Sequence, residues 1–399
     1  MRILQLCNKP PVPAFDGGSK AMYNIARGLL DAGHQVKVVC ISTPKHPLQL
    51  DEVPEDFRSR TAIEGIFVDT SLNVVDAFTD LLTADNYNVS RFFSPDVDIR
   101  LIRLLAEEKF DIVQLESLFV TPYIPNIRRY ANAPIVLRSH NLEHVLQQRI
   151  ARGERNLLKK PYRHFLARQL RDYEMAVLDR VDGVAAISPS DAEHFRAHGT
   201  RTPVVVIPFG VEMNDHDTTM PPGGPLFFHL GSMDWLPNEE GVRWLLNEVW
   251  PRVVEARPKA RLQLAGNRMP KDLLELERPG LTVQGRVKSA ELYMARHHVM
   301  VVPLLSAGGM RVKIVEGMAM GRCILSTTMG AEGIDATDGH DILLADDAAT
   351  MAQRMVELVD DPGRAAAIGR NAHDLVRRKY SNGPIVKDLV AFYRTLLKA

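Results

Sequence analysis

Residues 299–334 read VMVVPLLSAGGMRVKIVEGMAMGRCILSTTMGAEGI. An apolar strand pattern at 299–304 is followed by a glycine pair, a helical pattern from about Met310 and a second strand pattern at 323–327. A strand, a helix and a further strand in this order are typical of a parallel α/β sheet. The turn also places free backbone N–H groups and the positive end of a helix dipole at the carboxyl end of a strand, which favours a bound phosphate.

Two cations lie at the start of this predicted helix. Arg311 and Lys313 are unfavourable there for the helix alone, because cations suit the opposite end of the dipole. An anion between them and the helix would remove that penalty, so the sequence predicts an anion site. Glu316 lies three residues beyond Lys313 and is expected either to pair with it or to accept hydrogen bonds from a ribose. A surface ion pair is the simpler alternative.

The same alternation of short strands and amphipathic helices runs through most of the chain. A polar stretch rich in Gly, Pro and Asp interrupts it at 209–224, and the signal is irregular at 45–98, where we expect long loops. The predicted fold is α/β, with two doubly wound Rossmann-like domains facing a central cleft. Their expected bounds are 1–208 and 209–380, followed by a helix in 381–399 that packs back on the first domain. Strand patterns occur at 3–7, 36–41, 111–115, 134–138, 183–187, 203–208, 225–233, 261–266, 281–285, 299–304, 323–327 and 341–345.

Composition excludes several classes of protein. The 399 residues carry 49 Lys+Arg and 49 Asp+Glu, and this zero net charge argues against a nucleic-acid-binding surface over the whole protein. Three scattered cysteines are too few for a disulfide framework or a metal cluster. No apolar run approaches the ~20 residues that span a bilayer, and the N-terminus does not resemble a signal peptide. We therefore expect a soluble, cytoplasmic protein.

The block GGMRVKIVEGMAMG at 308–321 resembles the donor-binding motif of family-4 glycosyltransferases, which are retaining, nucleotide-sugar-dependent enzymes with the GT-B fold. Many members carry two glutamates in this motif, and Glu316 matches the second, which binds the ribose hydroxyls of the nucleotide. Gly308 stands where the first glutamate contacts the donor sugar. The resemblance therefore implies that backbone amides of Gly308, Gly309 and Met310 hold the sugar in this chain.

The resemblance extends to other parts of the second domain. In the segment at 231–246 the family usually has a glycine, an arginine and a lysine that bind the diphosphate. Here Glu240, together with Ser232 or Met233, replaces the basic pair, so Arg311 and Lys313 are the implied substitutes. Arg286 and Val287 resemble the segment near the nucleobase, and Arg268 follows another strand end. A solvated loop charge is the alternative for either of these arginines.

In the first domain, the resemblance involves residues that follow strand ends. Gly17 and Gly18 match the glycine-rich turn after the first strand, where backbone approaches a ligand closely. His140 lies where the family places a histidine near the donor sugar and its phosphate. Asn141 is expected on the same wall, and Glu116 is expected to meet an acceptor hydroxyl.

The resemblance implies an enzyme that transfers a sugar from a UDP- or GDP-sugar to a glycan or lipid-linked acceptor, with catalytic roles for His140, Arg311 and Lys313 and with no cofactor or obligatory metal. Asp96–Asp98 spells a DxD motif, but it follows a serine at a helix start, where capping explains it. The chain lacks GxGxxG, which argues against a dinucleotide oxidoreductase. A nucleotide-sugar 2-epimerase and a non-catalytic nucleotide-sugar-binding protein are the alternatives.

A basic segment at 149–171 holds six arginines and two lysines against one acid, interleaved with apolar residues. This pattern is typical of helices that lie on anionic lipid, and a solvated helix face is the alternative. The sequence therefore leaves two interpretations of 149–171 open, a solvated helix face and a peripheral contact with the inner face of a membrane, and it predicts no nucleic-acid partner.

Overall fold

The computed structural model describes residues 1–14, 16–70, 87–153, 156, 159–213, 218–306 and 309–398. The chain divides into two compact units. Unit 1 comprises Met1–Gly210 and Asn382–Ala399, and unit 2 comprises Val211–Ser381. The boundaries expected from sequence, after 208 and after 380, lie within two residues of these.

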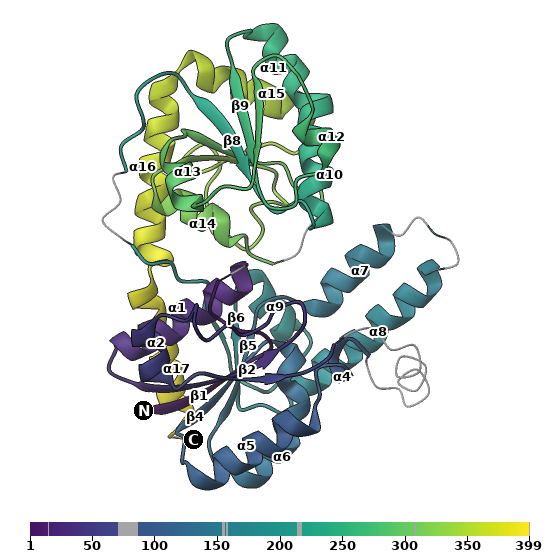
Figure 1. Ribbon diagram of the computed structural model, residues 1–399, viewed down its shortest axis with the longest axis vertical. Helices are drawn as coiled ribbons and strands as arrows, with labels where there is room; N and C mark the ends of the chain where they lie inside the picture. The colour runs from purple at the N-terminus through teal and green to yellow at the C-terminus, as the bar shows by residue number, and fades with distance from the viewer. Residues whose placement is uncertain are drawn as a thin grey trace. The chain divides into compact units, whose positions relative to one another are not determined.

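Unit 1 contains a parallel sheet with seven strands among the described residues, in the order β3-β2-β1-β4-β5-β6-β7 (Figure 1). The chain fills one side of β1 first and then continues from β4 on the other side, so the carboxyl ends of β1 and β4 form the point where such sheets bind ligands. The strands are β1 Arg2–Cys7, β2 Gln35–Ser42, β3 Glu64–Phe67, β4 Ile112–Glu116, β5 Ile135–Ser139, β6 Gly183–Ala186 and β7 Val204–Val206.

Helices cover both faces of this sheet. The last helix, α17 (Asn382–Leu396), packs on α1 (Gly17–Asp31), and an added Cβ at Gly28 of α1 would lie only 2.5 Å from the Val386 side chain. Burial of Leu389 and Tyr393 against the sheet makes α17 part of the unit 1 core. The other helices are α2 Glu55–Thr61, α4 Tyr87–Ser90, α5 Pro95–Glu107, the 3-10 helix Leu118–Tyr123, α6 Ile124–Tyr130, α7 Glu143–Gly153, α8 Lys159–Leu178 and α9 Pro189–Ala197.

Unit 2 is built in the same way around a parallel sheet with six strands among the described residues, in the order β10-β9-β8-β11-β12-β13. Its strands are β8 Leu226–Leu230, β9 Arg261–Ala265, β10 Leu281–Gly285, β11 Val299–Val302, β12 Cys323–Ser326 and β13 Leu343–Leu344. Its helices are α10 Leu236–Trp244, the π-helix Leu245–Val249, α11 Trp250–Ala256, α12 Lys271–Leu274, α13 Ala290–Ala295, α14 Val312–Ala319, α15 Ala348–Asp360 and α16 Pro362–Lys379.

The α/β class and the two doubly wound sheets are confirmed. The loops expected at 45–98 are wrong in part, because α2 and β3 lie there. β3 has only four residues at the sheet edge and buries every second one only partly, so its hydrophobic signal is weak. Residues 71–86 of that region lie outside the described part of the chain. Among the helices described, none has the length and hydrophobicity needed to cross a lipid bilayer.

Candidate functional site

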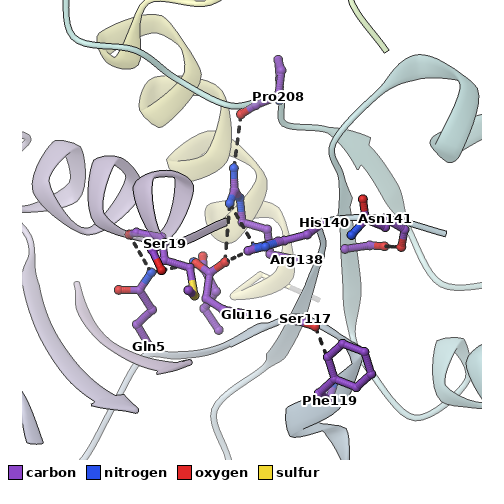
Figure 2. Close-up of polar contacts among 12 residues, drawn as sticks. Gln5, Ser19, Glu116, Ser117, Phe119, Arg138, His140, Asn141 and Pro208 are labelled. Carbon is purple, nitrogen blue, oxygen red and sulfur yellow. Dashed lines mark hydrogen bonds and ion pairs between the residues drawn. The ribbon is translucent and has the colours of Figure 1, made fainter. Parts of the chain in front are cut away.

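A buried charged cluster lies at the carboxyl ends of the central strands of unit 1 (Figure 2). Glu116 ends β4 and is in register with Cys7 of β1 and Arg138 of β5, so the three side chains share one face of the sheet. His140 follows β5 directly and its Nε2 lies 2.6 Å from Glu116 Oε2. Arg138 lies 3.5 Å from the same oxygen and also donates to the backbone oxygen of Pro208 at 3.2 Å. Glu116 and Arg138 are at most 1 % exposed.

Two glutamine side chains hold the other oxygen of the Glu116 carboxylate, Oε1, by hydrogen bonds. Gln5 of β1 donates to Glu116 Oε1 at 2.7 Å and to the Met22 backbone oxygen of α1 at 3.1 Å. Gln114 of β4 donates to the same carboxylate oxygen and accepts from the hydroxyl of Tyr393 in α17. The last helix of the chain therefore supports the Glu116 and His140 pair through hydrogen bonds as well as through packing.

The charge states of this cluster follow from its partners. Burial disfavours the Glu116 carboxylate, but Arg138 and the hydrogen bond from His140 outweigh it and lower its pKa to about 2. Burial and Arg138 lower the pKa of His140, although Glu116 acts in the other direction. An ionised carboxylate only accepts hydrogen bonds, so Nε2 of His140 carries the proton. The neutral imidazole then presents an unprotonated Nδ1 as an acceptor.

These contacts change the role expected for Glu116. The prediction that it meets an acceptor hydroxyl is wrong, because its carboxylate is 0 % exposed and both oxygens accept bonds from protein groups. We assign Glu116 to the positioning of His140. Gly17 and Gly18 begin α1 as expected, but the Asp16 carboxylate already caps this helix by accepting from the Ser19 backbone at 2.9 Å.

Asn141 leads to a second buried acidic pair. Its side chain donates to Glu143 Oε1 at 3.2 Å, and Glu143 is 7 % exposed. Glu174 of α8 accepts from the backbone N–H groups of Glu143 and His144 at 3.1 and 3.0 Å, which caps the start of α7. Burial, with the nearby Glu174 charge, raises the pKa of Glu143 to about 7. This carboxyl therefore gains and loses a proton near neutral pH.

In unit 2 the helix α14 begins close to the expected position. Arg311 is its N-cap residue and Val312 its first residue, within two residues of the predicted start near Met310. The Arg311 side chain points back from the first turn of the helix. Its Nε donates to the Gly309 backbone oxygen at 3.1 Å, and its guanidinium lies 5.0 Å from the centroid of the Trp235 ring. Its positive charge stays beside the N-terminus of α14.

Lys313 reaches from the first turn of α14 to the end of β8. Its Nζ donates to the Leu230 backbone oxygen at 2.9 Å and to Asn238 Oδ1 of α10 at 3.4 Å. A Cβ added to Gly231 would lie 2.8 Å from Lys313 Nζ, 2.8 Å from Asn238 Nδ2 and 2.9 Å from His229 Nε2. Three nitrogens thus converge on the bare backbone of Gly231, which we call the Gly231 corner.

His229 and Lys313 have unusual charge states at the Gly231 corner. His229 is fully buried and its Nδ1 donates to the Val301 backbone oxygen at 2.9 Å, while Nε2 has no hydrogen-bond partner among the described residues. Burial and the nearby Lys313 lower the pKa of His229 to about 3. Burial and Arg311 lower the pKa of Lys313 to about 7, partly offset by Glu316. A buried nitrogen with no partner among the described residues lies here beside a lysine with a lowered pKa, and such groupings are frequent at ligand-binding sites.

The other residues predicted to bind the donor are not among those that form the Gly231 corner. Glu316 lies one turn beyond Lys313 in α14 and is partly buried. Gly309 has φ of 73°, a conformation that favours glycine, and Met310 is buried. Gly308 lies outside the described residues. Arg286 and Arg268 are exposed, Val287 is partly buried, and Arg268 lies 3.9 Å from Asp234.

Sequence reasoning missed two residues of the Gly231 corner, His229 and Asn238. It also missed Trp235, whose ring lies beside the Arg311 guanidinium. The strand-end position that identified His140 also applies to His229 near the end of β8, so this one signal was present in the sequence.

Neither unit shows a group of three or more His, Cys, Asp or Glu side chains suited to a metal, as far as the described residues extend. At the DxD segment, Ser94 caps α5 by accepting from the Asp96 backbone, and Asn126 donates to Asp98 at 2.6 Å. The capping explanation for this motif is confirmed.

Two protein families match the chain. Glycosyltransferase Family 4 matches residues 15–215, and Glycosyl transferases group 1 matches residues 224–361. A protein of Klebsiella pneumoniae described as an uncharacterized 44.6 kDa protein in the cps region is 22% identical over 97% of this chain and 98% of its own length.

Two solved structures share the architecture of the whole chain. Sucrose-phosphate synthase from Thermosynechococcus elongatus superposes with a TM-score of 0.72 at 16% identity, with 100% of each chain covered. HepE of Anabaena in complex with UDP-glucose superposes with a TM-score of 0.66 at 14% identity, covering 99% of this chain and 100% of its own. The chain therefore belongs to Glycosyltransferase Family 4, and its two doubly wound units are those of the GT-B fold.

Proposed function

We propose that the protein is a retaining, metal-independent glycosyltransferase that moves a sugar from a UDP- or GDP-sugar to a hydroxyl of a glycan or lipid-linked acceptor. Unit 2 binds the nucleotide sugar and unit 1 binds the acceptor. The family membership supports the reaction class, and the site geometry supports the assignment of residues.

The Gly231 corner is the observation that carries this proposal. Lys313 Nζ and Asn238 Nδ2 lie beside one glycine backbone, where they donate to the Leu230 and Ser232 backbone oxygens, and a bound diphosphate would take over these donors. Arg311 adds charge at the N-terminus of the adjacent helix. A diphosphate bound there meets donors from three elements and the positive end of a helix dipole. Such an arrangement replaces the arginine and lysine that the family usually has after this strand.

The same groups supply most of the catalysis. As the bond from the anomeric carbon to the diphosphate oxygen breaks, Lys313 and Arg311 stabilise the charge that develops on that oxygen. The acceptor oxygen bonds to the anomeric carbon, and its proton passes to the departing diphosphate. His140 accepts a hydrogen bond from the reacting groups through Nδ1, in the orientation that Glu116 fixes. Arg268, Arg286 and Val287 contact the nucleotide, and Gly308, Gly309 and Met310 contact the donor sugar.

The relatives support the substrate class. The solved HepE structure contains UDP-glucose, and the Klebsiella protein is described by its place in the cps region. We propose that this chain acts in the synthesis of a cell-surface polysaccharide or lipopolysaccharide, in the cytoplasm at the inner face of the membrane.

Glu316 provides the test of this function. Glu316→Ala removes the proposed acceptor for the ribose hydroxyls and is expected to lower kcat/KM for the nucleotide sugar by about 10- to 100-fold. Release of nucleoside diphosphate measures the rate, and Glu255→Ala on an exposed position of unit 2 serves as the matched control. Wild-type kinetics in Glu316→Ala would contradict the proposal that Glu316 binds the ribose hydroxyls.

The helix pair α7–α8 is the proposed membrane contact. These helices lie side by side (Figure 1), and their exposed apolar side chains include Ile150, Tyr162 and Phe165 at 40–45 % exposure. The arginines and lysines of 149–171 precede and follow these side chains in the sequence. Apolar groups inserted among lipid chains and cations at the headgroups would together bind an anionic bilayer.

Sedimentation with vesicles tests this contact. The wild-type chain is expected to pellet with phosphatidylglycerol-containing vesicles, less so at high salt, and Tyr162→Ser with Phe165→Ser is expected to stay in the supernatant. Leu292→Ser removes a residue of unit 2 that is 62% exposed and is the control. Equal pelleting of the double variant and the wild type would refute the contact.

A further inference from the structure

The strand order of unit 2 reverses between β8 and β11. In parallel sheets the carboxyl ends of two such strands form the point where ligands bind. The Gly231 corner lies at the end of β8, and Ser306 follows the end of β11. The helix α10 supplies Asn238 to the corner and also reaches the segment after β11, through a side chain that the chemistry proposed above does not use.

Gly241 brings α10 directly against the chain that leaves β11. A Cβ added at Gly241 would lie 2.2 Å from the Pro303 backbone oxygen and 2.9 Å from its carbonyl carbon, so only glycine permits this approach. Glu240, the preceding residue, extends to the next part of the same segment, where its Oε2 accepts a hydrogen bond from the Ser306 hydroxyl at 2.9 Å. The helix thus places one carboxylate at the point where the strand order reverses.

The Glu240 carboxylate is exposed and is available to a ligand. Its bond with Ser306 is the single hydrogen bond or ion pair that it makes among the described residues, and this bond leaves Oε1 available. By contrast, the adjacent Glu239 pairs with Arg243 at 2.8 Å. Two neighbouring carboxylates of one helix therefore differ, since one is bound by a cation of the protein and the other is oriented by a hydroxyl.

The chemistry of a carboxylate limits the ligand group that it can meet. An ionised carboxylate only accepts hydrogen bonds and repels a phosphate, so its partner carries O–H or N–H donors. The sugar of a nucleotide sugar is such a group, because it carries several hydroxyls and is joined to the diphosphate. In the proposed function the diphosphate lies in the Gly231 corner and the sugar contacts Gly309 and Met310, which follow Ser306 closely in the chain. The bond to Ser306 therefore holds Glu240 toward the part of the site that takes the sugar.

We propose that Glu240 is a specificity-determining residue that accepts hydrogen bonds from the hydroxyls of the donor sugar, in a direction that Ser306 fixes. This inference rests on the proposed glycosyltransferase function and names a group that selects its donor. A carboxylate forms strong, charge-assisted bonds to hydroxyls, and a site built around such bonds rejects a sugar that lacks the hydroxyl or carries it in another configuration.

Calorimetric titration of the full chain with nucleoside diphosphates and their sugar conjugates tests the inference. The probes are UDP, GDP, UDP-glucose, UDP-galactose, UDP-N-acetylglucosamine and GDP-mannose. Glu240→Ala is expected to weaken the conjugate that the wild type binds most tightly by about tenfold or more, the equivalent of one hydrogen bond to a charged group, and to leave the affinity for UDP and GDP unchanged. Glu240→Gln is expected to lose less, because it keeps an acceptor oxygen. Glu239→Gln, which neutralises the adjacent carboxylate, is the matched control and leaves all of these affinities unchanged.

Three results would overturn the inference. Equal weakening of nucleoside diphosphate and conjugate in Glu240→Ala would give the residue a structural role, and undiminished conjugate binding would remove it from the site. The third is a wild-type chain that binds none of the six probes, which would refute the donor site itself.

Release of nucleoside diphosphate from the same conjugates by the wild-type chain tests the proposed function separately. Conjugate binding that depends on Glu240 without any release refutes the transfer reaction alone. Release that Glu240→Ala leaves unchanged for every donor refutes the role of Glu240 alone.

Discussion

The Nε2 nitrogen of His140 lies 2.6 Å from Glu116 Oε2, and both side chains are held at the carboxyl ends of adjacent parallel strands. Glu116 remains ionised beneath the imidazole because Arg138 and His140 surround it. The pair thus fixes which nitrogen of His140 carries the proton, as well as the direction in which the ring faces.

Glu116→Gln is expected to destabilise unit 1 in a pH-dependent way. The folded pKa of about 2 lies below the ordinary value of 4.5, so the ionised group adds stability above about pH 4.5 and loses it as the pH falls toward 2. At ~1.4 kcal/mol for each pH unit this contribution is about 3 kcal/mol. The variant should therefore be less stable than the wild type at pH 7 and should approach it at low pH.

Hydrogen exchange at β4 and β5 measures this effect. All three tryptophans lie in unit 2, so tryptophan fluorescence would report on the wrong unit. Glu107→Gln at an exposed position of α5 serves as the control. A stability difference that stays constant from pH 7 to pH 3 would contradict the ion-pair account.

Glu143→Gln is expected to stabilise unit 1 above neutral pH. The folded pKa of about 7 is raised from 4.5, so the folded state holds a proton that the unfolded chain has released, and stability falls as the pH rises from 4.5 to 7. The neutral amide removes that cost, which is about 3 kcal/mol above pH 7. Urea unfolding followed by far-UV circular dichroism should show a gain at pH 8 and none at pH 4. An equal gain at both pH values, or a gain in the exposed control Glu193→Gln, would argue against a buried proton on Glu143.

Lys313→Met is expected to weaken nucleoside diphosphate binding and to remove its pH dependence. The free amine has a pKa of about 7, so above that pH the protein must take up a proton to bind a diphosphate as a charged ammonium. Wild-type affinity should therefore fall by up to about tenfold per pH unit above pH 7. Calorimetry at pH 6, 7 and 8.5 measures this, with Lys259→Met as the control. A wild-type affinity that does not change across this range would rule out Lys313 as the diphosphate ligand.

Gly231→Ala is expected to reduce nucleotide binding with little loss of stability. The added Cβ would lie 2.8–2.9 Å from the ends of three side chains, which move aside more cheaply than backbone does. Displacing Lys313 and Asn238 should weaken nucleoside diphosphate binding by about tenfold. Gly224→Ala, which meets nothing within 4 Å, is the matched control for calorimetry and thermal melting. Undiminished binding in Gly231→Ala would show that the corner does not hold the diphosphate.

Periodicity and turn residues predicted the fold because the central strands of both sheets, such as β4, β5, β11 and β12, are buried on both faces and have strong apolar signals. The strand-end rule pointed to His140, and the two cations at a helix start pointed to Lys313; the catalytic roles of both stay predictions. The strand-end rule gave Glu116 the wrong role, because burial of a strand-end side chain depends on Gln5, Arg138 and α17, which are distant in sequence. The convergence at Gly231 was invisible for the same reason, since Lys313 and Gly231 come from helices and strands 82 residues apart.

The central claim is the transfer of a sugar from a nucleotide sugar, and its most direct test is nucleoside diphosphate release from a panel of UDP- and GDP-sugars. The account predicts release by the wild-type chain from at least one donor, at a rate about 100-fold or more above that of His140→Ala. Binding of a donor that protects the chain against melting without any release of nucleoside diphosphate would contradict the claim. So would release of a free 2-epimerised sugar as the product.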